Sequence, residues 1–256
     1  MIVIKEEEEI EKMREAGRIT ALILREVAEM VKPGVSAHQL NEYAERRLRE
    51  LKAIPAFKNY PHPSGGKKYP AALCVSVNHE VVHGIPTRDK VFKEGDIVSL
   101  DFGVLKNGYY GDSALTVGIE PLTKRARQLI KTTREALYQA IKKAVAGARL
   151  GDISHAVQTY VERRGFSVVR DFAGHGIGTH LHEEPQVPNF GIPGRGPLLK
   201  ERMTMAIEPM VNMGDWRVRV ESDGWTVVTA DGQPSAHFEH TVVVRDGEAE
   251  ILTVVE

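Results

Sequence analysis

Ile97-Val98-Ser99-Leu100-Asp101-Phe102-Gly103-Val104-Leu105 is an apolar run with one acid at its centre, and it predicts a buried strand. The pair Asn107-Gly108 follows and favours a two-residue type I′ hairpin. In that hairpin Gly103 lies opposite Asp112. Opposed residues share a face of the sheet, as do residues two apart on one strand, so Asp101 and Asp112 project on the same side about 7–8 Å apart.

Two buried carboxylates on one face require a cation. Either acid alone is explained by a strand-end or turn position. An unpaired carboxylate in an apolar strand costs several kcal/mol, and residues 109–117, the returning strand, offer no Lys or Arg at a matching position. The pair therefore indicates a bound metal.

The second half of the chain shows the same pattern. Residues 205–211 form an apolar stretch that contains Glu208, and we expect a strand with this acid inside it. In residues 236–244, Glu239 is followed closely by a stretch of β-branched residues, which predicts another strand. Both stretches place a carboxylate in an apolar strand, as in the hairpin.

An internal repeat accompanies these acids. Residues 34–47 align without gaps on residues 151–164 and share Gly, His, Tyr, Glu, Arg and Arg. We expect one catalytic domain over residues 1–256, with similar halves over about 1–122 and 123–256 that face each other across a pseudo-twofold axis. Acids from both halves would then surround one central site.

Composition indicates a globular protein and excludes several classes. The chain has 256 residues, of which 42% are apolar and 27% charged, with a net charge of −1. Nothing in that balance suggests a nucleic-acid partner, and no apolar stretch reaches membrane-spanning length. A single cysteine, Cys74, excludes an intrachain disulfide, and residues 1–9 do not form a secretory signal. We expect a cytoplasmic protein.

The remaining pattern alternates helices and strands. Helices are predicted over residues 10–27, 34–47, 129–145 and 151–164, a strand over 71–77, and a loop over 185–197. Ser36 and Asp152 are the predicted N-caps of the two repeated helices.

Three short motifs carry histidines. They are His83-Gly84-Ile85-Pro86, Gly174-His175-Gly176-Ile177-Gly178 and His182-Glu183-Glu184-Pro185. The glycine-rich motif lacks both the ending of a P-loop and the spacing of a dinucleotide fingerprint. With Ile207-Glu208-Pro209-Met210 and Glu239-His240-Thr241 following in order, the chain resembles the type I methionine aminopeptidases of the pita-bread fold.

The resemblance runs from about Ile10 to Val244 and implies an α/β pita-bread fold, with an antiparallel sheet covered by helices. Glu208 follows His182 by only 26 positions, which is similar to type I, because type II enzymes have a helical insertion there. The chain also lacks the zinc-binding extension of eukaryotic members, so it resembles the short bacterial form. The family's five metal ligands fall on Asp101, Asp112, His175, Glu208 and Glu239. They would hold two divalent ions, Co, Mn, Fe or Zn.

The resemblance also implies roles for the other residues. His83, His182 and Glu208 would be catalytic, and both histidines would contact the substrate. Tyr69, Cys74 and Trp225 match positions of the family's methionine pocket. Pro63, Gly66 and Leu181 depart from the enterobacterial-type pattern, which has Cys, Tyr and Phe, but they leave the pocket apolar.

The function implied is removal of the N-terminal methionine from nascent proteins and peptides whose second residue is small. Partners would be nascent polypeptide N-termini near the ribosomal exit, and the enzyme is expected to be a monomer. Two alternatives remain. One is another pita-bread metallopeptidase such as an Xaa-Pro aminopeptidase, although the stretch before Asp101 leaves little room for its extra N-terminal domain. The other is a pita-bread binding protein without metal, in which the ligands would have been lost.

Overall fold

The predicted hairpin lies at the centre of the protein. The computed structural model describes residues 1–255, and in it β4 (Ile97–Lys106) and β5 (Tyr109–Gly118) pair with Gly103 opposite Asp112. Asn107 and Gly108 both have positive φ, 50° and 82°, as a type I′ turn requires. The register derived from the Asn-Gly pair is confirmed.

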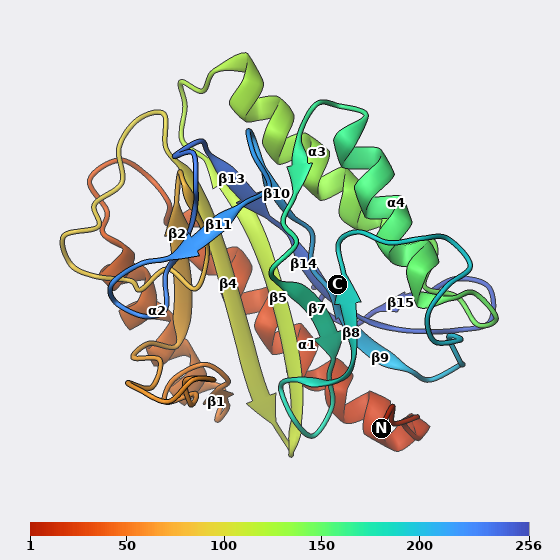
Figure 1. The fold of residues 1–256 in the computed structure, drawn as a ribbon. Coiled ribbons are helices and arrows are strands. Elements are labelled where there is room, and N and C mark those ends of the chain that lie inside the picture. The colour runs from red at the N-terminus through yellow and green to blue at the C-terminus, as the bar shows by residue number, and fades with distance from the viewer. Residues whose placement is uncertain (256) are drawn as a thin grey trace.

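One large antiparallel sheet runs through the molecule (Figure 1). Its order is β1-β4-β5-β14-β9-β7-β8, with β2 added on β4 and β15 on β14. The strands besides the hairpin are β1 (Ile54–Pro55), β2 (Leu73–Val77), β7 (Ala173–Gly176), β8 (Glu183–Pro188), β9 (Thr204–Ile207), β14 (Glu239–Val243) and β15 (Glu250–Ile251). The central pair, β5 and β14, joins the N-terminal hairpin to the C-terminal strands. The two-half organisation of one domain stays a prediction.

Two three-stranded sheets flank the large one. Their orders are β13-β10-β6 and β11-β12-β3. The strands are β3 (Glu80–Val82), β6 (Ser167–Val168), β10 (Met210–Asn212), β11 (Val218–Val220), β12 (Val227–Thr229) and β13 (Ser235–His237).

The structure corrects three strand and loop predictions. Residues 205–211 form two strands, because the chain leaves β9 after Ile207 and enters β10 at Met210, and Pro209 between them has no N–H for a ladder. Residues 236–244 likewise divide at Phe238 between β13 and β14. Glu208 and Glu239 thus lie where the chain crosses between sheets. The loop predicted from residue 185 begins inside β8, which pairs with β7.

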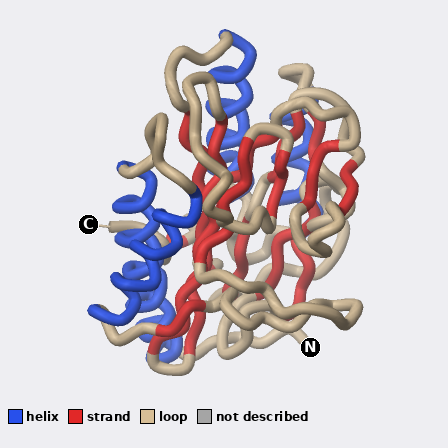
Figure 2. Tube along the Cα trace, turned by 90° about the vertical axis from the view of Figure 1, so that its left-hand side faces the viewer, coloured by secondary structure: helices blue, strands red, loops and turns tan. Residues whose placement is uncertain are grey.

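Four helices pack beside the strands: α1 (Glu7–Glu29), α2 (Ala37–Glu50), α3 (Lys124–Ile141) and α4 (Leu150–Glu162). Figure 2 shows a stack of helices along one side of the strands. The predicted cap of α2 is confirmed, because Ser36 Oγ accepts from Gln39 N. The predicted cap of α4 is wrong. Arg149 is the N-cap, and Asp152 sits one turn later, where its carboxylate accepts from Arg149 N at 2.8 Å.

Helices α1 and α2 share an apolar core with β2 and β4, and α3 and α4 share another with β9 and β14. Helix α1 crosses β5 at two glycines. A Cβ on Gly111 would lie 2.7 Å from Gly17 N, so only hydrogen fits between the two backbones. This contact fixes the strand immediately before Asp112. Within residues 1–255, no helix combines the length and hydrophobicity needed to cross a membrane.

Candidate metal centre

A cavity of about 640 Å³ opens beside the central strands, and every site residue expected from the sequence lines it. These residues are Tyr69, Cys74, His83, Asp101, Asp112, His175, His182, Glu208, Trp225 and Glu239. These residues come from both halves of the sequence. The pairing of β5 with β14 in one sheet brings them together.

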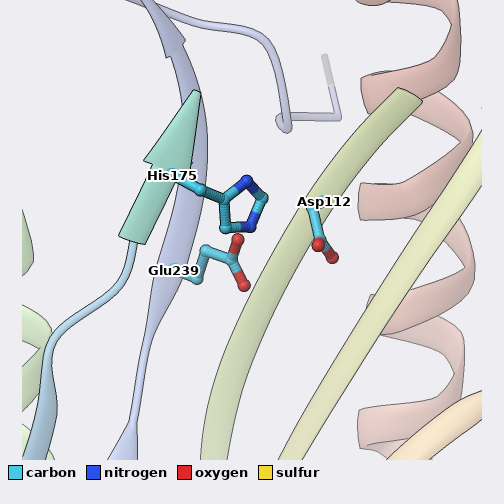
Figure 3. Close-up of side chains that lie close together, drawn as sticks. All are labelled: Asp112, His175 and Glu239. Atoms are coloured by element: carbon cyan, nitrogen blue, oxygen red, sulfur yellow. The ribbon is translucent and has the colours of Figure 1, made fainter. Parts of the chain in front are cut away.

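Two overlapping groups of ligand atoms lie at this cavity, and all of their residues except His237 line it. In one group Asp112, His175 and Glu239 place one atom each within 4.8 Å of the others. Figure 3 shows these three side chains close together. In the other group Glu208, His237 and Glu239 do the same. Glu239 belongs to both. Asp101 belongs to neither group, but it lines the same cavity and lies on β4 beside β5.

Strand pairing sets the spacing of the carboxylates. Glu239 begins β14 and pairs with Ala114 of β5. Thr241 Oγ1 accepts from Asp112 N at 3.0 Å and donates to Asp112 O at 2.8 Å. The Thr241 side chain of β14 thus holds the backbone of β5 at Asp112, which supplies one of the carboxylates.

The four carboxylates repel one another in this arrangement. Burial, together with the neighbouring acids, raises the pKa of Asp101, Glu208 and Glu239 well above their usual values. Burial raises the pKa of Asp112 to about 7. Desolvation lowers the pKa of His175 to about 3, so its imidazole is neutral and able to bind a metal.

The donor atoms fit divalent cations. Asp101 Oδ1, Asp112 Oδ1 and Glu239 Oε1 are buried without a hydrogen-bond partner among the described residues. Buried polar atoms are normally paired. Carboxylate oxygens with one or two imidazole nitrogens suit Mn, Fe, Co or Zn. Cations between these oxygens would satisfy the unpaired atoms and relieve the repulsion.

His237 also belongs to this cluster, although none of the sequence motifs includes it. It is 1% exposed, its Nε2 has no hydrogen-bond partner among residues 1–255, and this atom lies 3.6 Å from Glu208 Oε2. Its backbone exchanges two hydrogen bonds with Thr116 Oγ1, at 2.7 and 2.9 Å. A histidine in an apolar strand two residues before Glu239 was the available signal.

His83 and His182 face the same space from loops. The ring of His182 lies edge-on to the ring of His175, with centroids 4.3 Å apart, and its Nδ1 is 2.5 Å from the hydroxyl of Tyr60. His83 has φ of 59°, a left-handed conformation that costs energy and is often kept at functional sites. Burial, then the charge of His182, lowers the pKa of His83 to about 4. Burial also lowers the pKa of His182.

Another part of the cavity wall is apolar and aromatic. Tyr69 and Trp225 pack edge to face with ring centroids 5.2 Å apart, and Tyr69 donates its hydroxyl hydrogen to Gly84 O at 2.9 Å. Cys74 is buried beside them. These contacts hold the aromatic rings in fixed positions.

Of the three residues that depart from the enterobacterial-type pattern, two lie in the wall of this pocket and one does not. Pro63 and Leu181 line it, whereas Gly66 is exposed and does not. Phe57 and Tyr60 also line the pocket and were missed. They belong to a segment, residues 56–69, with little regular structure, so no periodic pattern marked the side that faces inward.

Comparison with known proteins gives one consistent result. The sequence profile of Metallopeptidase family M24 matches residues 11–246. A curated relative, methionine aminopeptidase of Clostridium acetobutylicum, is 49% identical over 256 residues, with 100% of both chains covered. The crystal structure of methionine aminopeptidase from Thermotoga maritima superposes with a TM-score of 0.95 at 51% identity, again over 100% of both chains.

A more distant likeness extends to other enzymes of the fold. An X-Pro aminopeptidase from Thermotoga maritima superposes with a TM-score of 0.75 at 22% identity, and 99% of this chain covers 63% of that one. That similarity shows the fold alone. The full-length matches, together with the carboxylate and histidine cluster, settle the family and the pita-bread fold: the chain belongs to Metallopeptidase family M24.

Proposed function

We propose that this enzyme is a methionine aminopeptidase, which removes the N-terminal methionine from peptides and nascent proteins whose second residue is small. The observation that carries the proposal is a cavity in which an apolar pocket adjoins a cluster of four carboxylates, two of them buried and two half-buried. Full-length relatives that bear this name at about half identity support it.

The pocket suits a methionine side chain. Aromatic and aliphatic side chains surround it, and the sulfur of methionine makes favourable contacts with aromatic rings. Tyr69 and Trp225 supply such rings, and Leu181 closes the side next to His182. A long unbranched residue fills this space, while a charged one would lose its solvation there.

We propose that Asp101, Asp112, His175, Glu208 and Glu239 hold two divalent ions. When bound, such ions lower the pKa of a water molecule and polarise the substrate carbonyl. The identity of the ions, Co, Mn, Fe or Zn, is open to elemental analysis of protein purified without added metal.

The protein's own groups would divide the remaining work. Glu208, as a carboxylate, would accept the proton of the attacking water. His182 donates to the carbonyl oxygen as negative charge develops there, and His83 contacts the nitrogen of the scissile amide. A donor of this kind typically contributes about 10²–10³ in rate.

Peptide hydrolysis tests the proposal. Purified enzyme should release methionine from Met-Ala-Ser when Mn²⁺ or Co²⁺ is present and lose this activity after chelation. It should leave an Ala-Pro-Ser peptide intact. Cleavage of the proline peptide in preference to Met-Ala-Ser would favour an Xaa-Pro aminopeptidase, and binding of either peptide without cleavage would favour a non-catalytic protein.

We also propose a cytoplasmic monomer that meets its substrates near the ribosomal exit. One feature supports the last point. Residues 121–170, which contain α3 and α4, have eleven Lys and Arg against three Asp and Glu, although the whole chain has a net charge of −1. Such a surface is attracted to phosphate. Sedimentation with ribosomes at low salt, and its loss in a Lys142→Glu, Lys143→Glu variant, tests the contact. Light scattering tests the oligomeric state.

A further inference from the structure

A buried lysine near the N-terminus touches the loop that carries His182. Lys5 is 1% exposed and is among the largest fully buried side chains of the protein. Its ammonium donates to Glu183 Oε2 at 2.6 Å. A lysine is almost never fully buried without a partner, and the proposed reaction gives this one no role.

The backbone around Lys5 is anchored independently of that ion pair. Lys5 N donates to Arg202 O at 3.1 Å, and Ile4 bridges Met203 just before β9. The segment that presents the ammonium is therefore tied to the two residues that lead into β9. It offers a fixed point rather than a mobile tail.

Glu183 stands at the other end of the pair and follows His182 directly. Its second oxygen, Oε1, accepts from His180 N at 3.1 Å and from Thr179 Oγ1 at 3.4 Å. One carboxylate thus joins Lys5 to two points of the turn between β7 and β8. Its side chain is 11% exposed and is not part of the cavity wall.

Gly178, at the start of the turn, shows how closely Lys5 is enclosed. A Cβ on Gly178 would lie 2.4 Å from Lys5 Cε and 2.6 Å from Glu183 Oε1. Gly178 O also accepts from Tyr110 N at 2.9 Å. The turn is therefore held by β5 on one side and by the lysine on the other.

We propose that Lys5 is a positioning residue for His182. By neutralising Glu183 at a fixed place, it sets the backbone of residues 179–183 and so aims the imidazole into the cavity. Without the ammonium, Glu183 would be a largely buried, unpaired charge. The turn would move to expose it, and His182 would move with the turn. This inference rests on the proposed role of His182 in the reaction.

Lys5→Met removes the charge and keeps an unbranched side chain, and Lys12→Met is the matched control on the exposed face of α1. With Met-Ala-Ser as substrate, we expect Lys5→Met to lower kcat about 10- to 100-fold, part of the loss typical for a missing oxyanion donor. KM and metal content should stay near wild type, and the control should leave all three unchanged. An unchanged kcat in a folded Lys5→Met protein would overturn the proposal.

The same substitution in a His182→Ala variant distinguishes an effect of Lys5 on the position of His182 from a general effect on protein stability. Once His182 is replaced by alanine, Lys5→Met should cause no further loss of kcat, because the two residues act through one interaction. If the loss is as large in that background as in the wild type, the lysine acts elsewhere and the proposal is wrong. Should Lys5→Met fail to fold, Glu183→Gln provides the same comparison, since the amide keeps the shape and loses the charge.

A spectroscopic readout keeps this inference distinct from the reaction itself. In metal-free protein, ring resonances of labelled histidine report the surroundings of each imidazole. Lys5→Met should shift or broaden the signal of His182 and leave that of His240, on β14, in place. An unmoved His182 signal would refute the positioning role even if the enzyme were active. A moved signal in a protein that does not cleave Met-Ala-Ser would count against the proposed function alone.

Discussion

Asp112→Asn should stabilise the metal-free protein while it destroys the metal site. Asp112 is 4% exposed, and burial raises its pKa from 3.8 to about 7. Between these values the folded protein keeps a proton that the unfolded chain has lost. The free energy of unfolding therefore falls as pH rises from about 4 to about 7 and stays low above that. Asparagine does not titrate, so the free energy of unfolding of the Asp112→Asn variant does not fall in this way as the pH rises.

The size of the effect follows from the pKa shift. Each unit corresponds to about 1.4 kcal/mol, so the shift of Asp112 destabilises the metal-free wild type by about 4 kcal/mol at pH 8. At pH 5, only about 1.2 units above the unfolded value, the penalty is about 1.7 kcal/mol. We therefore expect the advantage of Asp112→Asn to grow about 2.5-fold between pH 5 and pH 8.

Urea unfolding in the presence of a chelator measures this directly, with Asp246→Asn as control because Asp246 is exposed on a turn. Added Mn²⁺ should reverse the order, because ions that bind the folded state stabilise it and the variant lacks a ligand. A variant that is less stable than wild type at pH 8 without metal, or an advantage that does not change with pH, would refute the electrostatic reasoning.

Three further outcomes are expected. Glu208→Gln should keep the fold and nearly abolish methionine release, because the group that accepts the water proton is lost; near wild-type turnover would remove Glu208 from that role. His182→Ala should lower kcat about 10²–10³-fold with little change in metal content, and loss of metal on elemental analysis would mean that His182 is a ligand. The protein should retain its own Met1, because Ile2 is branched and bulky. Intact-mass measurement of wild type and of an Ile2→Ala version, which should lose Met1, checks the preference for a small second residue.

The hairpin was predictable from sequence because its determinants are local. An Asn-Gly pair fixes the turn, the turn fixes the register, and the register places Asp112 opposite Gly103. The motif residues could likewise be gathered into one site, because the resemblance supplied their order. The cavity wall contains all ten predicted site residues.

Features that depend on distant contacts were missed or wrong. The break at Glu208 arises because the chain changes sheets there, which the apolar run 205–211 does not show. Asp152 has a side chain that suits an N-cap, yet the N-cap of α4 is Arg149, three residues earlier, where the chain pairs with Leu198. His237 and Lys5 gain their surroundings from segments that are far away in sequence, at Glu208 and Glu183. A pattern confined to neighbouring residues does not report such partners.

Titration of metal-free enzyme with Mn²⁺, monitored in parallel by calorimetry and by methionine release from Met-Ala-Ser, tests whether the carboxylate and histidine cluster holds the ions on which the reaction depends. Two ions should bind per chain, methionine release should be absent before they bind, and the Asp112→Asn variant should lose both binding and release. Methionine release at the full rate from protein with no bound metal, or unimpaired binding by the variant, would contradict this expectation.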